Sequence, residues 1–164
     1  MKTTAALVAL LLVSLLSAQT PPAPPPEARQ FDFWVGDWEV FSPDGKKQGE
    51  NRIERMADGW GLLENWTAAN GTTGKSLNTW TPRTKRWQQF WVSAGGALEL
   101  TGGLNDMGEM VLEGRFIRRD GQEQVNRITW IPNSDGTVRQ LWQSSTDGGA
   151  TWATAFDGLY RKKG

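Results

Sequence analysis

Hydrophobic and polar residues alternate over short stretches along most of the chain, and turn residues separate these stretches. The stretches are rich in β-branched and aromatic residues, and Gly, Asp, Asn or Pro follows each of them. This pattern is typical of strands joined by tight turns. The expected strands are 38–42, 49–56, 61–67, 75–81, 86–92, 97–101, 110–117, 123–131, 137–144 and 151–160.

The number and order of these strands predict an all-β fold, an up-and-down antiparallel barrel of about ten strands. Closure is favoured because it removes the edge strands through which an open sheet aggregates. A barrel of this width can enclose a small ligand. The alternative architecture is a sandwich of two packed sheets, which the same pattern also allows.

The alternation also predicts which side chains point inward, because successive side chains of a strand lie on opposite faces. Charged residues on either side of Ile53 place that side chain inside. Two arrangements remain open on the strand 123–131: Arg127 inside facing Glu64, or Arg127 outside with Trp130 inside. The other inward sets are Leu62, Glu64 and Trp66; Trp87, Gln89 and Trp91; Met110, Leu112 and Phe116; Gln140, Trp142 and Ser144; and Trp152 and Phe156.

The composition excludes most catalytic chemistry. The chain has ten tryptophans but no histidine and no cysteine. It therefore lacks the residues for a Ser-His-Asp or Cys-His nucleophile, a His/Cys zinc site, a His- or Cys-ligated haem and a redox cysteine pair. We expect no catalytic residue set, no metal and no cofactor. A net charge near zero gives no electrostatic reason to expect a nucleic-acid partner.

The N-terminal segment has the pattern of a secretory signal peptide. Lys2 precedes an apolar run over 5–16, and the small residues Ser17 and Ala18 follow it. We expect a signal peptide over 1–18, a Pro-rich linker over 19–30 and a single barrel domain over 31–164. After cleavage no stable membrane insertion is expected, whereas an uncleaved anchor is the alternative. An exported domain without disulfides points to a bacterial periplasm or the extracellular medium.

The segment 31–40, FDFWVGDWEV, leads an aromatic turn into a Gly-x-Trp triplet at the first strand. This entry resembles that of lipocalins and related calycin barrels. In that family the Trp plugs the closed end of the barrel, and an Arg of the final strand packs over its ring. The resemblance implies structural roles for Trp38 and for Arg161.

The mature chain is also similar to a family of exported bacterial proteins of unknown function with lipocalin-like barrels. This resemblance implies the fold and export, but it implies no activity. Nitrobindin-like haem barrels share the architecture and depend on a histidine, which this chain lacks. The similar segments are 31–40, 63–66, 74–80, 87–92, 102–104, 127–130, 138–142 and 156–161.

Residues 145–152 match an Asp-box, a motif that recurs in sialidase propellers. A propeller needs several blades of four strands, so a single copy predicts only a stable hairpin. Of the carboxylates, Glu64 is the one we expect to be buried among aromatic side chains. Such burial would raise its pKa and suit acid/base chemistry. A hydrogen-bonded carboxylate inside the barrel is the simpler interpretation.

We therefore predict a barrel that binds a small hydrophobic or amphiphilic molecule in an aromatic-lined cavity. The alternatives are a carbohydrate-binding module with exposed tryptophan faces, a small acid/base enzyme that uses Glu64, and an assembly domain with a filled core. The sequence leaves the identity of the ligand and the oligomeric state open. The predicted ligand-binding residues are Glu64, Trp66, Gln89, Trp91, Arg127, Gln140 and Trp142.

Overall fold

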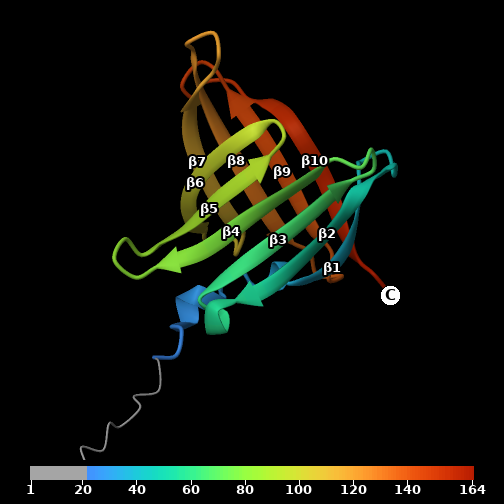
Figure 1. The fold of residues 1–164 in the computed structure, drawn as a ribbon, viewed down its shortest axis with the longest axis vertical. Helices are drawn as coiled ribbons and strands as arrows, with labels where there is room; N and C mark the ends of the chain where they lie inside the picture. The colour runs from blue at the N-terminus through green and yellow to red at the C-terminus, as the bar shows by residue number, and fades with distance from the viewer. Residues whose placement is uncertain (1–21) are drawn as a thin grey trace, which may run out of the picture.

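The computed structural model describes residues 22–164, and they form an all-β barrel. Ten antiparallel strands follow one another around the barrel, and β1 pairs with β10 to close it (Figure 1). The prediction of an up-and-down barrel of lipocalin-like architecture is confirmed. The strands are β1 (Gly36–Phe41), β2 (Lys47–Met56), β3 (Gly61–Ala68), β4 (Thr73–Thr81), β5 (Arg86–Ser93), β6 (Gly96–Leu104), β7 (Met110–Ile117), β8 (Glu123–Pro132), β9 (Val138–Ser145) and β10 (Ala153–Lys162).

The strands end where turn residues interrupt the alternation. Gly45 between β1 and β2 has a φ of 83°, and Gly136 between β8 and β9 has a φ of 82°. A side chain would strain the backbone at such angles, which is why glycine stands there. A short 3-10 turn, η3 (Ala57–Gly59), joins β2 to β3.

None of the helices in the described part of the chain is long and apolar enough to cross a membrane.

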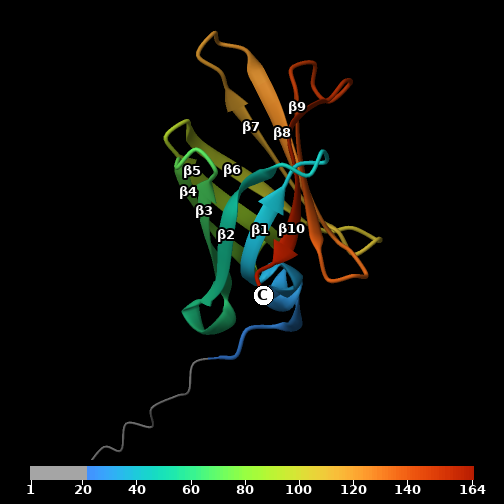
Figure 2. The same cartoon turned by 90° about the vertical axis from the view of Figure 1, so that its right-hand side faces the viewer.

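The closed sheet of the barrel has two short ladders. β6 pairs with β7 only from Thr101↔Glu113 to Leu104↔Met110, and β1 pairs with β10 only from Trp38↔Lys162 to Phe41↔Leu159. These two seams divide the strands of the one sheet into two groups, β1–β6 and β7–β10. Figure 2 shows the two groups diverging toward the end at which β7 and β8 project. Phe116, which we expected inside, lies on this projecting part of β7 and is 38% exposed.

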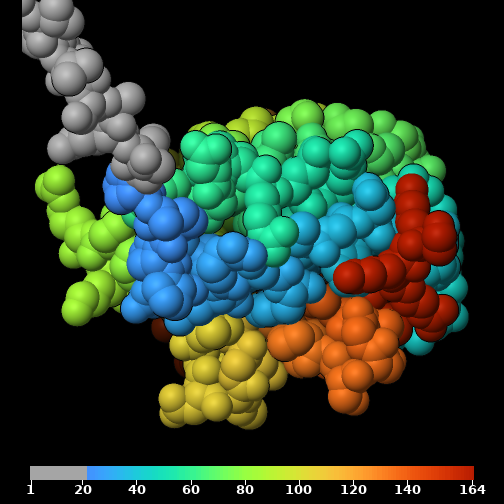
Figure 3. Space-filling model, turned by 90° about the horizontal axis from the view of Figure 1, so that it is seen from below, coloured from blue at the N-terminus to red at the C-terminus, as the bar shows by residue number. Residues whose placement is uncertain are grey.

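The opposite end of the barrel is closed by the N-terminal segment. Two 3-10 helices, η1 (Pro26–Arg29) and η2 (Asp32–Trp34), cross this end, where Figure 3 shows them in blue. The rings of Phe31 and Trp34 stack at 4.9 Å and are fully buried. Ala28 is also buried, so the fold begins before residue 31 and the last part of the expected linker belongs to the core. The expected signal peptide over 1–18 lies outside the described residues.

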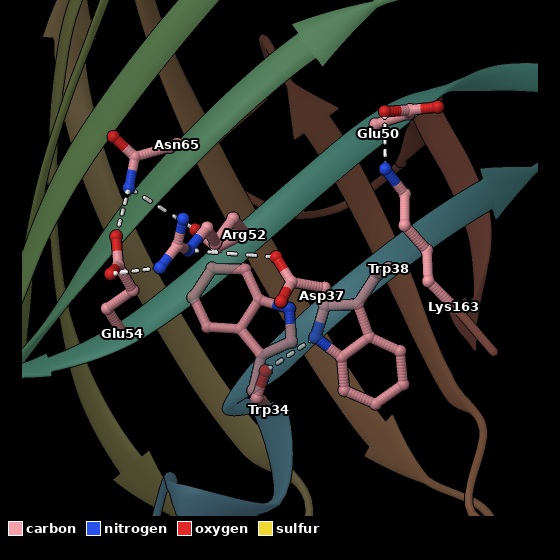
Figure 4. A network of polar contacts seen from close by, with 8 residues as sticks. All are labelled: Trp34, Asp37, Trp38, Glu50, Arg52, Glu54, Asn65 and Lys163. Atoms are coloured by element: carbon pink, nitrogen blue, oxygen red, sulfur yellow. Dashed lines mark hydrogen bonds and ion pairs between the residues drawn. The ribbon is translucent and has the colours of Figure 1, made fainter.

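Trp38 is fully buried in the barrel, as we expected for the tryptophan of the Gly-x-Trp triplet. Its indole N–H donates a hydrogen bond of 2.8 Å to the carbonyl of Trp34 (Figure 4). The cation over its ring is not Arg161 but Lys162, whose Nζ lies 5.5 Å from the ring centroid. Arg161 points outward because it is next to the inward-facing Tyr160, and it packs over Phe41 instead. The prediction for Arg161 is therefore wrong by one residue.

The outer surface near Trp38 carries a ladder of charged and polar side chains (Figure 4). Arg52 pairs with Asp37 at 3.7 Å and with Glu54 at 2.9 Å, and Asn65 donates to Glu54. These exposed pairs contribute little to stability individually. They confirm that the charged residues of β2 face solvent, which leaves Ile53 inside.

The Asp-box forms the predicted hairpin between β9 and β10. Asp147 accepts hydrogen bonds from Ser145 at 2.6 Å and from the backbone N–H of Thr151 at 2.9 Å, and these bonds lower its pKa. The indole N–H of Trp152 donates to the carbonyl of Gly149. The motif thus stabilises a turn, as its single copy indicates.

A bulge in β10 changes the face on which the residues after it lie. The register with β9 shifts between Thr154 and Phe156. An extra residue reverses the alternation. Trp152 and Phe156 therefore lie on different faces, although we expected them on one: Phe156 lines the interior, and Trp152 packs outside against Arg127.

Candidate functional site

The interior of the barrel is arranged in three layers that β5 crosses in order. Trp87 belongs to a buried aromatic plug at the closed end, Gln89 to a polar layer, and Trp91 to an aromatic mouth at the other end. We use these three names for the following sets. The plug is Phe31, Trp34, Trp38, Trp87 and Trp130; the polar layer is Asn51, Glu64, Ser76, Asn78, Gln89, Gln140 and the hydroxyl of Tyr160; the mouth is Trp66, Trp91, Trp142 and Phe156.

The carboxyl group of Glu64 is the centre of the polar layer. It is 4% exposed, and it accepts a hydrogen bond of 2.7 Å from the Asn51 amide and one of 2.6 Å from the Ser76 hydroxyl. Both donors come from the strands on either side of β3, directly or diagonally opposite the carboxyl group. Two neutral donors satisfy the carboxyl oxygens without neutralising their charge.

The other members of the layer extend this network in both directions. Asn78 donates to Ser76 at 2.8 Å, and the Gln89 amide donates to Asn78 at 2.9 Å. On the other side, the amide of Asn51 also lies 3.2 Å from the hydroxyl of Tyr160, which in turn donates to Gln140. A continuous chain of hydrogen bonds therefore crosses the interior.

Burial decides the protonation of this layer. Removal from water raises the pKa of Glu64 from its ordinary 4.5 to about 7, although the bonds from Ser76 and Asn51 act in the opposite direction. Burial, with the charge of Glu64 nearby, also raises the pKa of Tyr160 well above its usual range. The layer thus contains one group that changes charge near neutral pH, and that group is Glu64.

The aromatic side chains of the mouth are held in place by glycines and by a hydrogen bond. A β-carbon on Gly74 would lie 2.2 Å from the ring of Trp91, and one on Gly49 would lie 2.7 Å from the ring of Trp66. The two indoles therefore lie directly against bare backbone. The indole N–H of Trp142 donates a bond of 2.9 Å to Asn126. The ring orientations are consequently fixed without any ligand.

A cavity of about 120 Å³ lies between the polar layer and the mouth. The structure brings six of the seven predicted ligand-binding residues to this one cavity. The lining is Glu64, Trp66, Gln89, Trp91, Leu98, Ile128, Gln140, Trp142, Phe156 and Tyr160. Asn51, Ser76 and Asn78 support it from behind and were missed, although each lies two residues from an inward-facing neighbour on its own strand.

Arg127 is the predicted residue that does not reach the cavity. Its guanidinium group forms an ion pair with Glu113, its direct cross-strand partner, and stacks over Trp152 at 4.1 Å. All of these contacts lie on the outer surface, so the prediction of Arg127 at the site is wrong. The alternation of β8 instead puts Ile128 and Trp130 inside, where both are buried.

Gly74→Ala is expected to disturb the mouth because the new methyl group would overlap the ring of Trp91. Overpacking of this kind costs about 1–3 kcal/mol and forces the ring to move. The near-ultraviolet circular dichroism of the tryptophans should change together with the melting temperature. Gly103→Ala is the control, because a β-carbon there meets nothing within 4 Å. If the two variants show the same circular dichroism and the same melting temperature, the Trp91 ring does not pack against Gly74 as described.

Among the described residues, no cluster of acidic side chains is arranged to hold a metal ion. No protein-family model matches the chain, and no curated protein matches it. The resemblance to exported lipocalin-like barrels therefore stays a prediction from the sequence.

Proposed function

We propose that the protein binds a small hydrophobic or amphiphilic molecule in the cavity beneath the aromatic mouth. The observation that carries this proposal is a preformed cavity with aromatic walls on one side and convergent polar groups on the other. Such a combination is typical of small-molecule sites, where the walls bury an apolar body and a few polar groups orient it. The ring orientations set by Gly74, Gly49 and Asn126 reduce the entropy that binding would cost.

The size of the cavity limits the ligand. The plug fills the closed half of the barrel, and the remaining space is about 120 Å³. A protein cavity of about 150 Å³ holds a benzene molecule. The proposed ligand is therefore a compact molecule, or the compact head of a longer one whose remainder passes between the side chains of the mouth.

Binding should quench the fluorescence of the mouth tryptophans, and truncation of these residues should weaken it. Trp91→Ala and Trp142→Ala each remove one aromatic wall, for which we expect a loss of affinity of about tenfold. Trp152→Ala is the matched control because that indole lies outside the barrel. Fluorescence titration with a panel of compact apolar and amphiphilic molecules measures the effect. A control variant that binds as weakly as the other two would contradict the site.

An acid/base enzyme is a second candidate, and one observation favours it. Glu64 faces the cavity and has a pKa raised to about 7, where a side chain exchanges protons most effectively. Glu64→Gln separates the two functions. If the protein only binds its ligand, neither the natural protein nor the Glu64→Gln variant converts the bound molecule. If it is an enzyme, the natural protein converts its substrate, and the variant still binds the substrate but loses turnover. The carbohydrate-binding alternative has less support, because five of the ten tryptophans are buried and the other five are only partly exposed.

Export of the protein is part of the proposal and rests on the N-terminal pattern alone. Cleavage after Ala18 would leave a mature chain that begins at Gln19. Mass spectrometry of the protein recovered from the periplasm or medium should show the loss of the first eighteen residues. An intact N-terminus on a membrane-bound protein would indicate an uncleaved anchor instead.

A further inference from the structure

The cavity combines a buried carboxyl group with a complete lack of basic side chains in its lining. Glu64 is 4% exposed and receives hydrogen bonds only from the neutral side chains of Asn51 and Ser76. No Lys or Arg is among the described residues that line the cavity. A buried carboxylate in this position is costly unless a positive charge accompanies it. The protein itself does not provide that charge.

The walls of the same cavity are suited to a positive charge. Trp66, Trp91 and Trp142 surround it, with the rings of Phe156 and Tyr160. The face of an aromatic ring carries partial negative charge and attracts cations, and tryptophan does so most strongly. Several such faces around one space form the type of cage that binds quaternary ammonium groups. The rings need no rearrangement, since glycines and Asn126 already hold them.

We infer that the ligand of this cavity is an organic cation, an alkylammonium compound whose charged group lies between the tryptophan faces and the carboxyl group of Glu64. This inference rests on the proposed function and specifies its ligand class. Gln89 and Gln140, which reach the cavity from opposite sides, are placed to accept or donate hydrogen bonds to a second polar group. A carboxylate ligand such as a fatty acid is disfavoured, because ionised Glu64 would repel it and the lining offers no base to neutralise either charge.

The size of the cavity agrees with this class. About 120 Å³ is slightly less than the cavity of about 150 Å³ that holds benzene, so it has room for a trimethylammonium head whose substituent extends into the mouth. The charge of a quaternary ammonium group does not depend on pH. Any pH dependence of its binding therefore reports on the protein.

The pH dependence of binding follows from the groups around Glu64. The side chains that face it are Asn51 from β2, Ser76 from β4, Gln89 from β5, Gln140 from β9 and Tyr160 from β10. Only Tyr160 among these five titrates, and its pKa is raised well above neutral pH. Glu64 therefore controls the affinity: a cation should bind more tightly above the pKa of about 7, where the carboxyl group is ionised.

The test compares three molecules of the same shape and different charge by calorimetry and tryptophan fluorescence. They are choline, its neutral analogue in which carbon replaces nitrogen, and the tert-butylacetate anion. Choline should bind at least about tenfold more tightly than the neutral analogue, and the anion should bind least. The affinity for choline should rise about tenfold between about pH 5.5 and pH 8.5. The neutral analogue should show no such rise.

Glu64→Gln should remove both the preference for the cation and its pH dependence. Glu99→Gln is the matched control, because that carboxylate is exposed on β6 outside the barrel, and it should leave both unchanged. If Glu64→Gln does not fold, the pH series on the unmodified protein still decides. Equal affinities of choline and its neutral analogue would overturn the inference and leave the proposed function standing. If none of the three binds and no other compact molecule quenches the mouth tryptophans, the proposed function itself fails.

Discussion

Trp38→Ala is expected to lower the free energy of unfolding by about 3–5 kcal/mol, the range for large aromatic truncations in a core. The side chain is fully buried, its ring packs edge-on against Tyr160 at 6.1 Å, and its N–H satisfies the carbonyl of Trp34. Its removal leaves a cavity and also an unpaired carbonyl at the point where the N-terminal segment closes the barrel. Denaturant unfolding followed by circular dichroism measures the loss.

Trp152→Ala provides the comparison for this prediction. That indole is partly buried outside the barrel, where it supports the hairpin of the Asp-box and the guanidinium group of Arg127. We expect a clearly smaller loss than for Trp38. A change of less than about 1 kcal/mol for Trp38→Ala would mean that the plug does not stabilise the barrel. The lipocalin comparison would then misplace this residue.

The second large effect is a loss of stability as the pH rises, caused by Glu64. The pKa of this group is about 7 in the folded protein and an ordinary 4.5 in the unfolded chain. Below pH 4.5 the carboxyl group is protonated in both states, and it imposes no penalty. Between these two values the unfolded chain releases the proton and the folded protein retains it. Stability therefore falls as the pH rises through this window and then stays constant.

The difference between the two pKa values corresponds to about 3 kcal/mol. Urea unfolding at a series of pH values between about 4.5 and 8 should show this decline, and Glu64→Gln should abolish it. Glu50→Gln is the control. The pKa of Glu50 is lowered by Lys163 and Lys47, so its contribution is lost only at lower pH. A decline that persists in Glu64→Gln would assign the effect to another group.

The strands and most of the cavity wall could be predicted because both depend on local information. Glycines and prolines mark the turns, and the period of two gives the faces of β3, β5 and β9. This is why Glu64, Trp91 and Trp142 were placed correctly relative to the interior. Asn51 could have been found by the same rule, since it lies two residues before the inward-facing Ile53 on β2. Small polar residues on a strand are readily taken for solvent-facing ones.

The failures come from features that are not local. The bulge in β10 separates Trp152 from Phe156 through a single extra residue, which the alternation does not reveal. Both faces of β8 mix apolar and polar residues, so the alternation does not show which face points inward. Arg127 lies on the outer face, where it pairs with Glu113 of the neighbouring strand, and this partner cannot be read from the sequence of β8. The composition of 19–30 is that of a linker, yet contacts with the end of the barrel bury Ala28.

The two short ladders of the closed sheet also predict how the native barrel fluctuates. A motion that parts the strands β1–β6 from the strands β7–β10 breaks only the four residue pairs of each ladder. Every other separation between neighbouring strands breaks a longer ladder. Amide hydrogens of these two seams should therefore exchange with solvent before those at the centre of either group of strands. The same separation of the strands would widen the space above Glu64 and let a bound molecule leave. The lifetime of the bound molecule and the exchange rate of the seam amides would then depend on the same motion.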